Sequence, residues 1–511
     1  MLTEDSHVEE LVSNEVEDQD APILRALVGT LGPDRVQSAP EILAAYQENN
    51  TEYRPRKILA VASPTSRDEL VAIIRLANSY RTPIYPFSTG MNWGLGSKLP
   101  VVDDCILVNL AAMNRIIEVN ETLAYAVIEP GVTQKQLCDY LEARRIPLML
   151  NVTGSSANSS IVGNTLERGV GVLGQRTRDL RELEVVLGTG EIIRTGQQHH
   201  FGETRGPSYY SYGMGPDMLH LFTQSNLGVV SNITIDLAPK RNITVALIET
   251  PKAHVAEYID KLAMLRRFDI LSDGIELTTQ NDPRLLGLDA SYHFGSDSWL
   301  TWVKLWHRSP SLSAEVKDTI ATELDGLIQS VHYFETGGEV PDAIKFRQNL
   351  GLGIPTNYTL DNMGRAFGVD AKNGNLDVDH HKNIPGFVCL LPAVPFHGQG
   401  VIDAVRVITE ASQRLGCQPA ITLSAIGKYA FEGFARVYFN RNDTQDVARA
   451  HEWSRVAQAE LASIGVFPYR INVEDMVSFA KEDDPFWSLV KRFKQVCDPN
   501  GVIAPGRYCP L

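Results

Sequence analysis

The run from Pro86 to Gly96 contains the residue types that a phosphate-binding loop needs. It follows a strand-like segment, 83–85, and reads Pro86-Phe87-Ser88-Thr89-Gly90-Met91-Asn92-Trp93-Gly94-Leu95-Gly96. Glycine accepts positive φ angles and lets the backbone approach a ligand closely, and successive N–H groups in a tight turn form a concave anion site. On these residues alone, the run is either a diphosphate-binding loop or a plain turn.

Two further runs have a similar composition. Residues 153–171 are dense in glycine, serine and asparagine, so little of this run can belong to a core. Its backbone and hydroxyl donors suit a diphosphate or the polar edge of a ring system. Residues 215–230 hold another glycine turn, which enters a β-branched strand. No GxGxxG opens a helix after the first strand, which argues against a nicotinamide-binding Rossmann site.

The first loop lies in a stretch where apolar strands alternate with amphipathic helices. Strands are predicted at 57–62 and 105–110, and Ser66-Arg67-Asp68-Glu69 predicts a helix start with a capping box. A third apolar segment, 124–133, runs into a helix that starts near Thr133. This order of elements predicts an α/β lobe.

The composition changes after Leu237-Ala238-Pro239, which indicates a second domain. Its strands are predicted at 245–248, 387–391 and 435–439, and its helices at 254–266 and about 400–415. We therefore expect an open antiparallel sheet backed by helices. The predicted units are a disordered acidic tail at 1–21, a first domain at 22–242, a second at 243–465, and a C-terminal segment of short motifs at 466–511.

The composition of the 511 residues excludes several functional classes. The formal net charge is −15 and no cluster of basic residues stands out, so we expect no binding to nucleic acid. There is no apolar run that could span a bilayer and no signal-like start, so we expect a cytoplasmic protein that does not associate with membranes. The six cysteines lack zinc-binding spacing, and no metal site is predicted.

Taken together and in this order, the runs resemble the vanillyl-alcohol oxidase and p-cresol methylhydroxylase family of flavoproteins. The matching motifs extend over nearly the whole chain beyond residue 40. They are STGxNxGxG at 88–96, PGVT at 130–133, GNTLERGVG at 163–171, LFTQSNLGVV at 221–230 and DPNGVIAPGR at 498–507.

The resemblance implies an α+β protein with a two-lobed PCMH-type FAD-binding domain and an antiparallel-sheet cap domain backed by helices. The cofactor that it implies is FAD, held by the first domain and by the C-terminal segment 466–511, which returns to the FAD domain, with the cap over the isoalloxazine ring. The implied FAD-binding residues are Pro86, Ser88, Thr89, Gly90, Met91 and Asn92 in the diphosphate loop, Gly154, Ser155, Gly163 and Asn164 along the flavin, Asn226, Gly228 and Val229 on the adenosine side, Arg507 near the ring, and Gly169 and Val230 in the same loops.

Members of this family bind a para-substituted phenol as its phenolate and transfer hydride from the benzylic carbon to the flavin, which gives a quinone methide. Loss of hydride makes the carbon cationic, so a phenolate that feeds charge into the ring lowers the barrier. Tyr469 and Arg470 match the family's pair that holds this oxygen ionised. Arginine stays charged, and the tyrosine hydroxyl can donate a hydrogen bond.

The sequence departs from the family pattern within the implied substrate pocket. A second phenolate-binding tyrosine of the family falls at Leu95, so an apolar group replaces one donor. Ser155 aligns where oxidases of vanillyl alcohol carry an aspartate, so a base must come from elsewhere or be absent. The paired histidines of some relatives align near Glu432 and Gly433, and Arg436 falls where the methylhydroxylase has an acid.

Covalent attachment of the flavin is left open by the residues. The family's oxidase-type histidine position aligns with Phe387, which cannot form such a bond, and no tyrosine occupies the methylhydroxylase-type position. His380 and His381 are the nearest candidates by spacing, because neutral imidazole can add to an activated flavin methyl group. The alternative is that 377–383, which is polar almost throughout, is an exposed loop.

We therefore expect an FAD-dependent oxidoreductase that takes hydride from the benzylic carbon of a para-substituted phenol or aromatic alcohol. One alternative is oxidation of a non-phenolic alcohol or a specialised metabolite, which Leu95 favours. Another is a flavin-binding partner subunit without catalysis. The expected partners are a small aromatic or alcohol substrate, oxygen or a cytochrome as electron acceptor, and further copies of the chain in a homo-oligomer.

Overall fold

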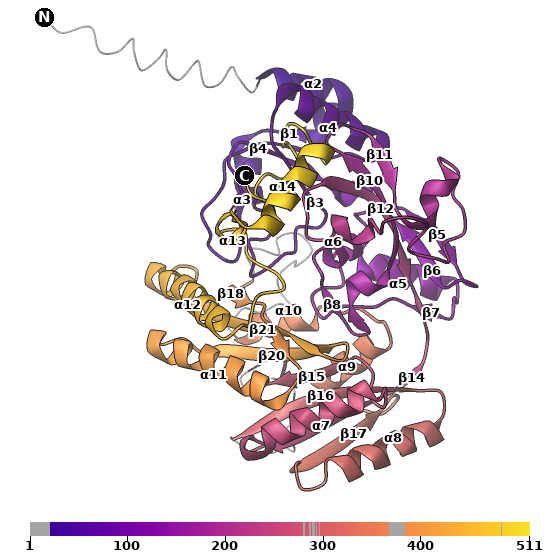
Figure 1. The fold of residues 1–511 in the computed structure, drawn as a ribbon, viewed down its shortest axis with the longest axis vertical. Helices are drawn as coiled ribbons and strands as arrows, with labels where there is room; N and C mark the ends of the chain where they lie inside the picture. The colour runs from indigo at the N-terminus through magenta and orange to yellow at the C-terminus, as the bar shows by residue number, and fades with distance from the viewer. Residues whose placement is uncertain are drawn as a thin grey trace, which may run out of the picture.

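Two lobes, each built on its own sheet, form one half of the molecule, and a large sheet with its helices forms the other (Figure 1). This computed structural model describes residues 21–511 apart from 280–281, 286–287, 289–291, 293, 296, 367–383 and 482. Mixed helices and sheets in separate layers confirm the predicted α+β fold class.

The first lobe is a four-stranded sheet in the order β1-β2-β4-β3, in which β2, β4 and β3 are parallel. Its elements are α2 (Ala21–Leu31), β1 (Val36–Gln37), α3 (Pro40–Gln47), β2 (Ile58–Ala62), α4 (Arg67–Tyr80), β3 (Ile84–Phe87) and β4 (Cys105–Asn109). All of β2 is buried, as is typical of a parallel strand covered on both faces. The side chain of Ser66 accepts a hydrogen bond from the backbone N–H of Glu69, which confirms the predicted start of α4.

The second lobe is a five-stranded antiparallel sheet in the order β11-β10-β12-β6-β5. Its main elements are β5 (Ile116–Asn120), β6 (Tyr125–Ile128), α5 (Gln134–Ala143), α6 (Ile161–Leu166), β10 (Leu180–Leu187), β11 (Ile192–Arg194) and β12 (Gly228–Asp236). Thr133 caps α5, as the sequence predicts, and Leu137 and Leu141 face the apolar core. Short strand pairs are β7 (Leu148–Met149) with β13 (Ala238–Pro239) and β8 (Val170–Gly171) with β9 (Gly174–Gln175).

The chain then enters the cap, an antiparallel sheet in the order β17-β14-β16-β15-β20-β21-β18, with β19 paired to β21. Its strands are β14 (Asn242–Pro251), β15 (Ile275–Thr278), β16 (Ser298–His307), β17 (Ser330–Glu335), β18 (Gly386–Leu390), β19 (Ala393–Pro395), β20 (Pro419–Ile426) and β21 (Ala430–Phe439). Its helices are α7 (Val255–Arg267), α8 (Pro310–Glu323), α9 (Asp342–Gly351), α10 (Tyr358–Ala366), α11 (Gly398–Leu415) and α12 (Thr444–Ser463).

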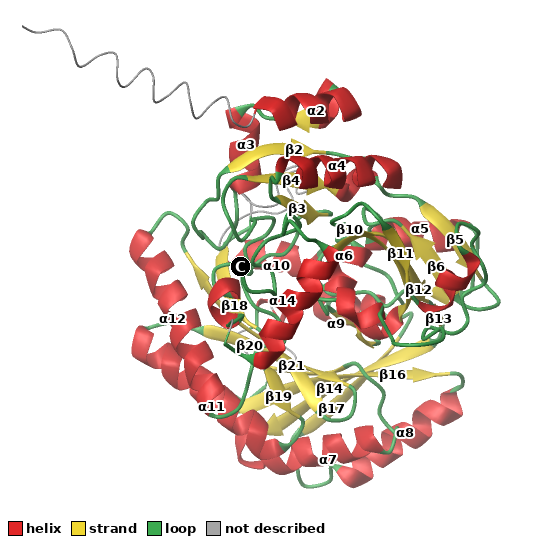
Figure 2. Ribbon diagram, turned by 45° about the horizontal axis from the view of Figure 1, so that its top comes forward, coloured by secondary structure: helices red, strands yellow, loops and turns green. Residues whose placement is uncertain are grey.

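The cap sheet has an outer face covered by helices and an inner face turned toward the two lobes. Figure 2 shows α7, α8, α11 and α12 on the outer side and α9 and α10 between the sheet and the lobes. Because side chains alternate along a strand, Phe431, Ala435 and Val437 of β21 enter the outer core, while Glu432 and Arg436 point inward. The inner face of the cap is therefore where polar side chains meet the lobes.

The last part of the chain returns to the lobes, where α13 (Met476–Phe479) and α14 (Pro485–Cys497) lie (Figure 1). Ile503 forms a parallel bridge with Ile84 of β3. The ammonium group of Lys494 donates to the backbone oxygens of Asn226 (2.6 Å) and Ile503 (2.7 Å). Among the described helices, none combines the length and apolarity that crossing a bilayer requires.

Candidate active site

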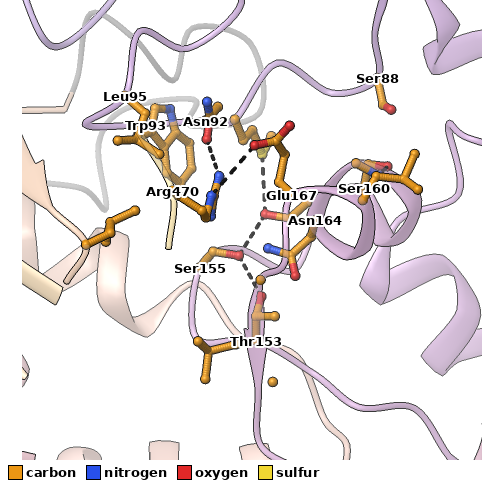
Figure 3. A pocket seen from close by; sticks show the side chains of 18 of the residues that line it. Ser88, Asn92, Trp93, Leu95, Thr153, Ser155, Ser160, Asn164, Glu167 and Arg470 are labelled. Carbon is orange, nitrogen blue, oxygen red and sulfur yellow. Dashed lines mark hydrogen bonds and ion pairs between the residues drawn. The ribbon is translucent and has the colours of Figure 1, made fainter. Parts of the chain in front are cut away.

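A cavity of about 430 Å³ lies between the two lobes and the inner face of the cap. Figure 3 shows part of its wall. Every catalytic, cofactor-binding and pocket residue predicted above lines this cavity, from Pro86 to Arg507, except two. These two are His380 and His381, which lie outside the described residues. Residues that are far apart in the sequence therefore meet at one site.

The glycine loop after β3 is held from two sides. Thr89 Oγ1 accepts a hydrogen bond of 3.1 Å from the backbone N–H of Ser160, which ties the loop to the start of α6. Gly94 has φ of 75°, and a Cβ at this position would lie 2.5 Å from the ring of Phe387 in β18. Only glycine avoids this collision, so the loop approaches the cap strand closely.

The loops at 153–171 and 215–230 offer hydroxyls and buried acceptors to the cavity. Thr153, Ser155 and Ser159 form a chain of hydroxyl hydrogen bonds of 2.8 and 3.0 Å (Figure 3). In the described part of the chain, Asn164 Oδ1 and Asn226 Oδ1 are buried without a hydrogen-bond partner. Buried acceptors are normally paired. FAD carries ribityl and ribose hydroxyls and ring N–H groups that can donate to them, so the cavity wall fits this cofactor.

Glu167 is the acidic centre of a buried cluster on the cavity wall. It accepts hydrogen bonds from Arg507 and, at 3.2 Å, from the hydroxyl of Tyr508. Its carboxylate also lies 3.8 Å from Nε of Arg470. Burial would raise the pKa of Glu167, but the charges of Arg507 and Arg470 outweigh it and hold the pKa below its usual value. Arg507 is thus paired with Glu167 at this site.

Arg470 joins the glycine loop to the cap side of the cavity. Its Nη2 donates a hydrogen bond of 2.6 Å to Asn92 Oδ1, while its Nε is buried and makes no hydrogen bond among the described residues (Figure 3). The neighbouring Tyr469 is fixed through its backbone, which donates to Leu391 at 2.9 Å and accepts from Gln224 at 2.7 Å. Burial raises the pKa of Tyr469 well above its usual value, and the charge of Glu432 acts in the same direction.

The carboxyl group of Glu432 uses only one of its two oxygens in hydrogen bonds to described residues. Gln175 Nε2 donates a hydrogen bond of 2.6 Å to its Oε1, but Oε2 is buried and has no partner among the described residues. Burial raises the pKa of Glu432 to about 7, although Gln175 and Arg470 oppose this. Such a group can take or give a proton near neutral pH.

An apolar patch around Leu95 of the glycine loop lies beside these polar groups. Leu95 is only 4% exposed and packs with Cys389 and Leu391, beside Phe434 and Tyr469. No hydroxyl donor stands at this position of the wall. Arg436 lies further along the inner face and is already engaged, because it donates to the hydroxyl of Tyr438 and to Asp282, both at 2.7 Å.

Several cavity residues were missed by the sequence reasoning. Glu167 lies inside the GNTLERGVG run, and a charged residue between glycines was the available signal. Gln175 has no such signal. Glu276, Arg284 and Lys304 line the cap side of the cavity and come from strands or turns that are neighbours only in space. Lys304 is the one with a local signal, a lysine within the apolar strand β16.

Comparisons with known proteins agree with this arrangement. A family profile described as an FAD binding domain matches residues 58–196. The chain is 30% identical to 1'-carboxy-chondrochloren decarboxylase of Chondromyces crocatus, over 95% of this chain and 97% of the relative. It is 25% identical to the flavoprotein subunit of 4-cresol dehydrogenase (hydroxylating) of Pseudomonas putida, over 93% of each chain.

Solved structures show the same fold. Substrate-bound p-cresol methylhydroxylase superimposes with a TM-score of 0.85 at 22% identity, over 96% of this chain and 97% of the other. The chain belongs to the vanillyl-alcohol oxidase and p-cresol methylhydroxylase family. A further structure of this fold is 4-ethylphenol oxidase from Gulosibacter chungangensis in complex with isoeugenol, with a TM-score of 0.84 at 21% identity, over 96% and 97% of the two chains.

Membership of this PCMH-type family makes the protein an FAD-dependent oxidoreductase. When bound, FAD supplies the acceptor for two electrons and a proton equivalent from the substrate. The residues suited to hold it are those of the loops around Asn92, Asn164 and Asn226, because these loops carry the close-approach glycines and the unpaired acceptors.

Proposed function

We propose that the protein oxidises a small para-substituted phenol or aromatic alcohol by removing hydride from the benzylic carbon. The observation that carries this proposal is that Tyr469 and Arg470 line the same cavity as the loops suited to FAD. A cation and a hydroxyl donor are what a phenolate oxygen requires. The names of the relatives that act on 4-cresol and 4-ethylphenol support the same substrate class.

In this proposal each side chain has a defined task. Arg470 supplies the cation for the phenolate, and Asn92 holds its guanidinium in place by accepting a hydrogen bond from Nη2. Tyr469 stays protonated, since its pKa is raised, and can therefore donate a hydrogen bond to the same oxygen. The patch around Leu95 excludes water from the ring, which strengthens these polar contacts.

A second candidate is oxidation of a non-phenolic alcohol or a specialised metabolite, and two observations favour it. Leu95 supplies no donor for a phenolate. Glu432 has a pKa of about 7, and its Oε2 has no hydrogen-bond partner among the described residues. It can therefore accept the proton of a substrate hydroxyl while hydride leaves the carbon that carries this hydroxyl. The relative from Chondromyces crocatus is named for a decarboxylation, a reaction other than the benzylic hydride transfer proposed first.

Anaerobic titration of the FAD-loaded protein with a substrate panel tests the proposal. Bleaching of the oxidised flavin band by 4-cresol or vanillyl alcohol supports phenol oxidation. Bleaching only by non-phenolic alcohols supports the second candidate. If no compound reduces a flavin that dithionite can reduce, the chain acts as a flavin-binding partner subunit and the proposal is wrong.

The electron acceptor, the oligomeric state and the flavin linkage belong to the same proposal. We propose oxygen or a cytochrome as acceptor, and stopped-flow mixing of the reduced protein with oxygen decides between them, because an oxidase reoxidises rapidly. Light scattering of the purified protein tests the proposed homo-oligomer. Acid precipitation tests covalent attachment, since flavin that stays entirely in the supernatant excludes a bond to His380 or His381.

A further inference from the structure

The inner face of the cap carries an excess of buried positive charge. Four basic side chains, Arg284, Lys304, Arg347 and Arg436, lie with two acidic ones, Glu276 and Asp282, and all six are at most 16% exposed. Four positive against two negative charges leave two positive charges in excess among the described residues. One remains even if Glu432, on the same face, is fully ionised.

Both acidic side chains form ion pairs with arginines. Asp282 pairs with Arg284 at 2.6 Å and with Arg436 at 2.7 Å. Glu276 pairs with Arg347 at 3.3 Å and with Arg284 at 3.4 Å. The acids therefore balance the three arginines only in part, and among the described residues neither acid forms an ion pair with Lys304.

Lys304 carries a buried ammonium group that pairs with no other described residue. It is 5% exposed and lines the cavity, yet it makes no side-chain hydrogen bond or ion pair in the described part of the structure. It lies on the inner face of β16 between Trp302 and Trp306, where little water can reach it. Burial lowers the pKa of Lys304 to about 8, with Glu276 opposing this and Arg347 and Arg284 adding to it. An isolated charge in such a place is expensive unless a ligand pairs with it.

We propose that Lys304, with Arg284 beside it, binds a carboxylate group of the substrate. This inference rests on the proposed function, because it places the anion in the cavity that holds the substrate. A carboxylate there gains a charge-assisted hydrogen bond from Lys304 and removes part of the excess positive charge. Tyr469 and Arg470 hold one end of such a substrate, and Lys304 selects its acidic substituent.

The test compares acids with their amides on the FAD-loaded protein. The probes are 4-hydroxybenzoate and 4-hydroxycinnamate with 4-hydroxybenzamide and 4-hydroxycinnamamide, which lack an sp³ benzylic carbon and so bind without being oxidised there. Dissociation constants come from the change in flavin absorbance on titration. We expect at least one acid to bind about tenfold or more tightly than its amide, the effect of one charged hydrogen bond.

Variants assign this preference to one side chain. Lys304→Met removes the charge at similar volume and should bring the ratio of acid to amide affinity close to one, whereas Lys304→Arg should preserve it. Lys345→Met is the matched control, because Lys345 is an exposed lysine on the neighbouring helix α9 and its loss should change nothing. The comparison of acid with amide affinity in the unmodified protein tests the inference even if a variant fails to fold.

The outcomes separate this inference from the proposed function. No preference for either acid in the unmodified protein, or an unchanged preference in Lys304→Met, overturns the inference even if 4-cresol reduces the flavin. A preference that Lys304→Met abolishes supports the inference even if no phenol reduces the flavin, in which case the proposed reaction is the part that fails.

Discussion

Arg470 Nη2 donates a hydrogen bond of 2.6 Å to Asn92 Oδ1, and the two residues are 378 positions apart in the chain. Asn92 belongs to the loop suited to the FAD diphosphate, whereas Arg470 follows the cap. In the proposed site, this contact holds the cation that would bind the substrate against the loop that would bind the cofactor. We therefore expect binding of the cofactor and orientation of the substrate to be coupled through this side-chain pair.

Replacing Arg470 by alanine should abolish most phenol-dependent flavin reduction while FAD stays bound. Removing one group that stabilises charge in a transition state typically lowers the rate by about 10²–10³. The measurement is the anaerobic rate of flavin bleaching by 4-cresol, with flavin content checked by absorbance. Arg470→Lys is the control, since it keeps the charge but not the planar guanidinium. Its reduction rate should lie between those of the unmodified protein and of Arg470→Ala. An unchanged rate in Arg470→Ala contradicts the phenolate assignment.

Asn92→Ala should affect the same reaction less strongly. It leaves Arg470 in place but frees Nη2, so the guanidinium is less well oriented. We expect phenols to reduce the flavin more slowly, and addition of more substrate should not restore the rate. A rate equal to that of the unmodified protein at saturation, with normal flavin content, is the contrary result.

Glu432→Gln should remove a pH dependence centred near pH 7. If Glu432 accepts a proton, reduction speeds up as pH rises through its pKa of about 7. The glutamine variant should be slow and flat over this range. Measuring the reduction rate of an alcohol substrate from pH 5.5 to 9 decides it, and a profile shared by both proteins contradicts the role.

Glu432→Gln should slow flavin reduction, but it should stabilise the folded protein at high pH. The pKa of Glu432 is raised in the folded protein, so folding favours its protonated form. That contribution is present below the pKa of the unfolded chain and is lost as pH rises toward about 7. At pH 8, Glu432→Gln should therefore raise the free energy of unfolding, by at most about 3 kcal/mol. Urea unfolding at pH 5 and pH 8 measures it, and equal differences at both values are evidence against it.

Leu95→Tyr should improve phenol binding by returning a donor to the wall. Leu95 is packed against Cys389 and Leu391, so the larger ring also strains the site, by about 1–3 kcal/mol. Leu95→Phe has nearly the same bulk without the hydroxyl and isolates the two effects. We expect 4-cresol to bind several-fold more tightly to the tyrosine variant than to the phenylalanine variant. Equal dissociation constants would show that this position does not face the phenol oxygen.

Gly94→Ala should impair both stability and flavin binding. The positive φ costs a residue with a side chain about 1–2 kcal/mol, and the collision with Phe387 adds to it. Gly416→Ala is the matched control, because Gly416 also has positive φ but has open space around it. Thermal unfolding and flavin content of the purified variants test this, and similar values for both variants refute the close approach.

Local patterns predicted the elements that local chemistry determines. The Ser66 cap and the Thr133 cap were visible in the sequence, because an N-cap hydroxyl bonds within three residues of itself. The glycine loops were visible for a similar reason. The capping box of α4 differs in one detail, since the Glu69 carboxylate accepts a hydrogen bond of 2.8 Å from the backbone N–H of Thr65, one residue before the cap, and also pairs with Arg35, 34 residues away.

The cap side of the site could not be predicted in this way. Glu276 faces Ser424 across β15 and β20, and Lys304 lies near Glu276 through the next strand, so these neighbours arise from strand order alone. Tyr469 and Arg470 were found because the family motif names them. The resemblance could not show that Glu432 keeps an unpaired oxygen, which depends on Gln175 from the other half of the molecule.

The bridge between Ile84 and Ile503 has a consequence for how the protein is made. The third strand of the first lobe gains a neighbour from the very end of the chain, and Lys494 ties that end to Asn226. A ribosome releases these last residues only after the whole cap has been synthesised. Domains fold in order as they emerge, so we expect the cap to be folded before the cofactor half is complete. We therefore expect loading with FAD to follow synthesis of the cap.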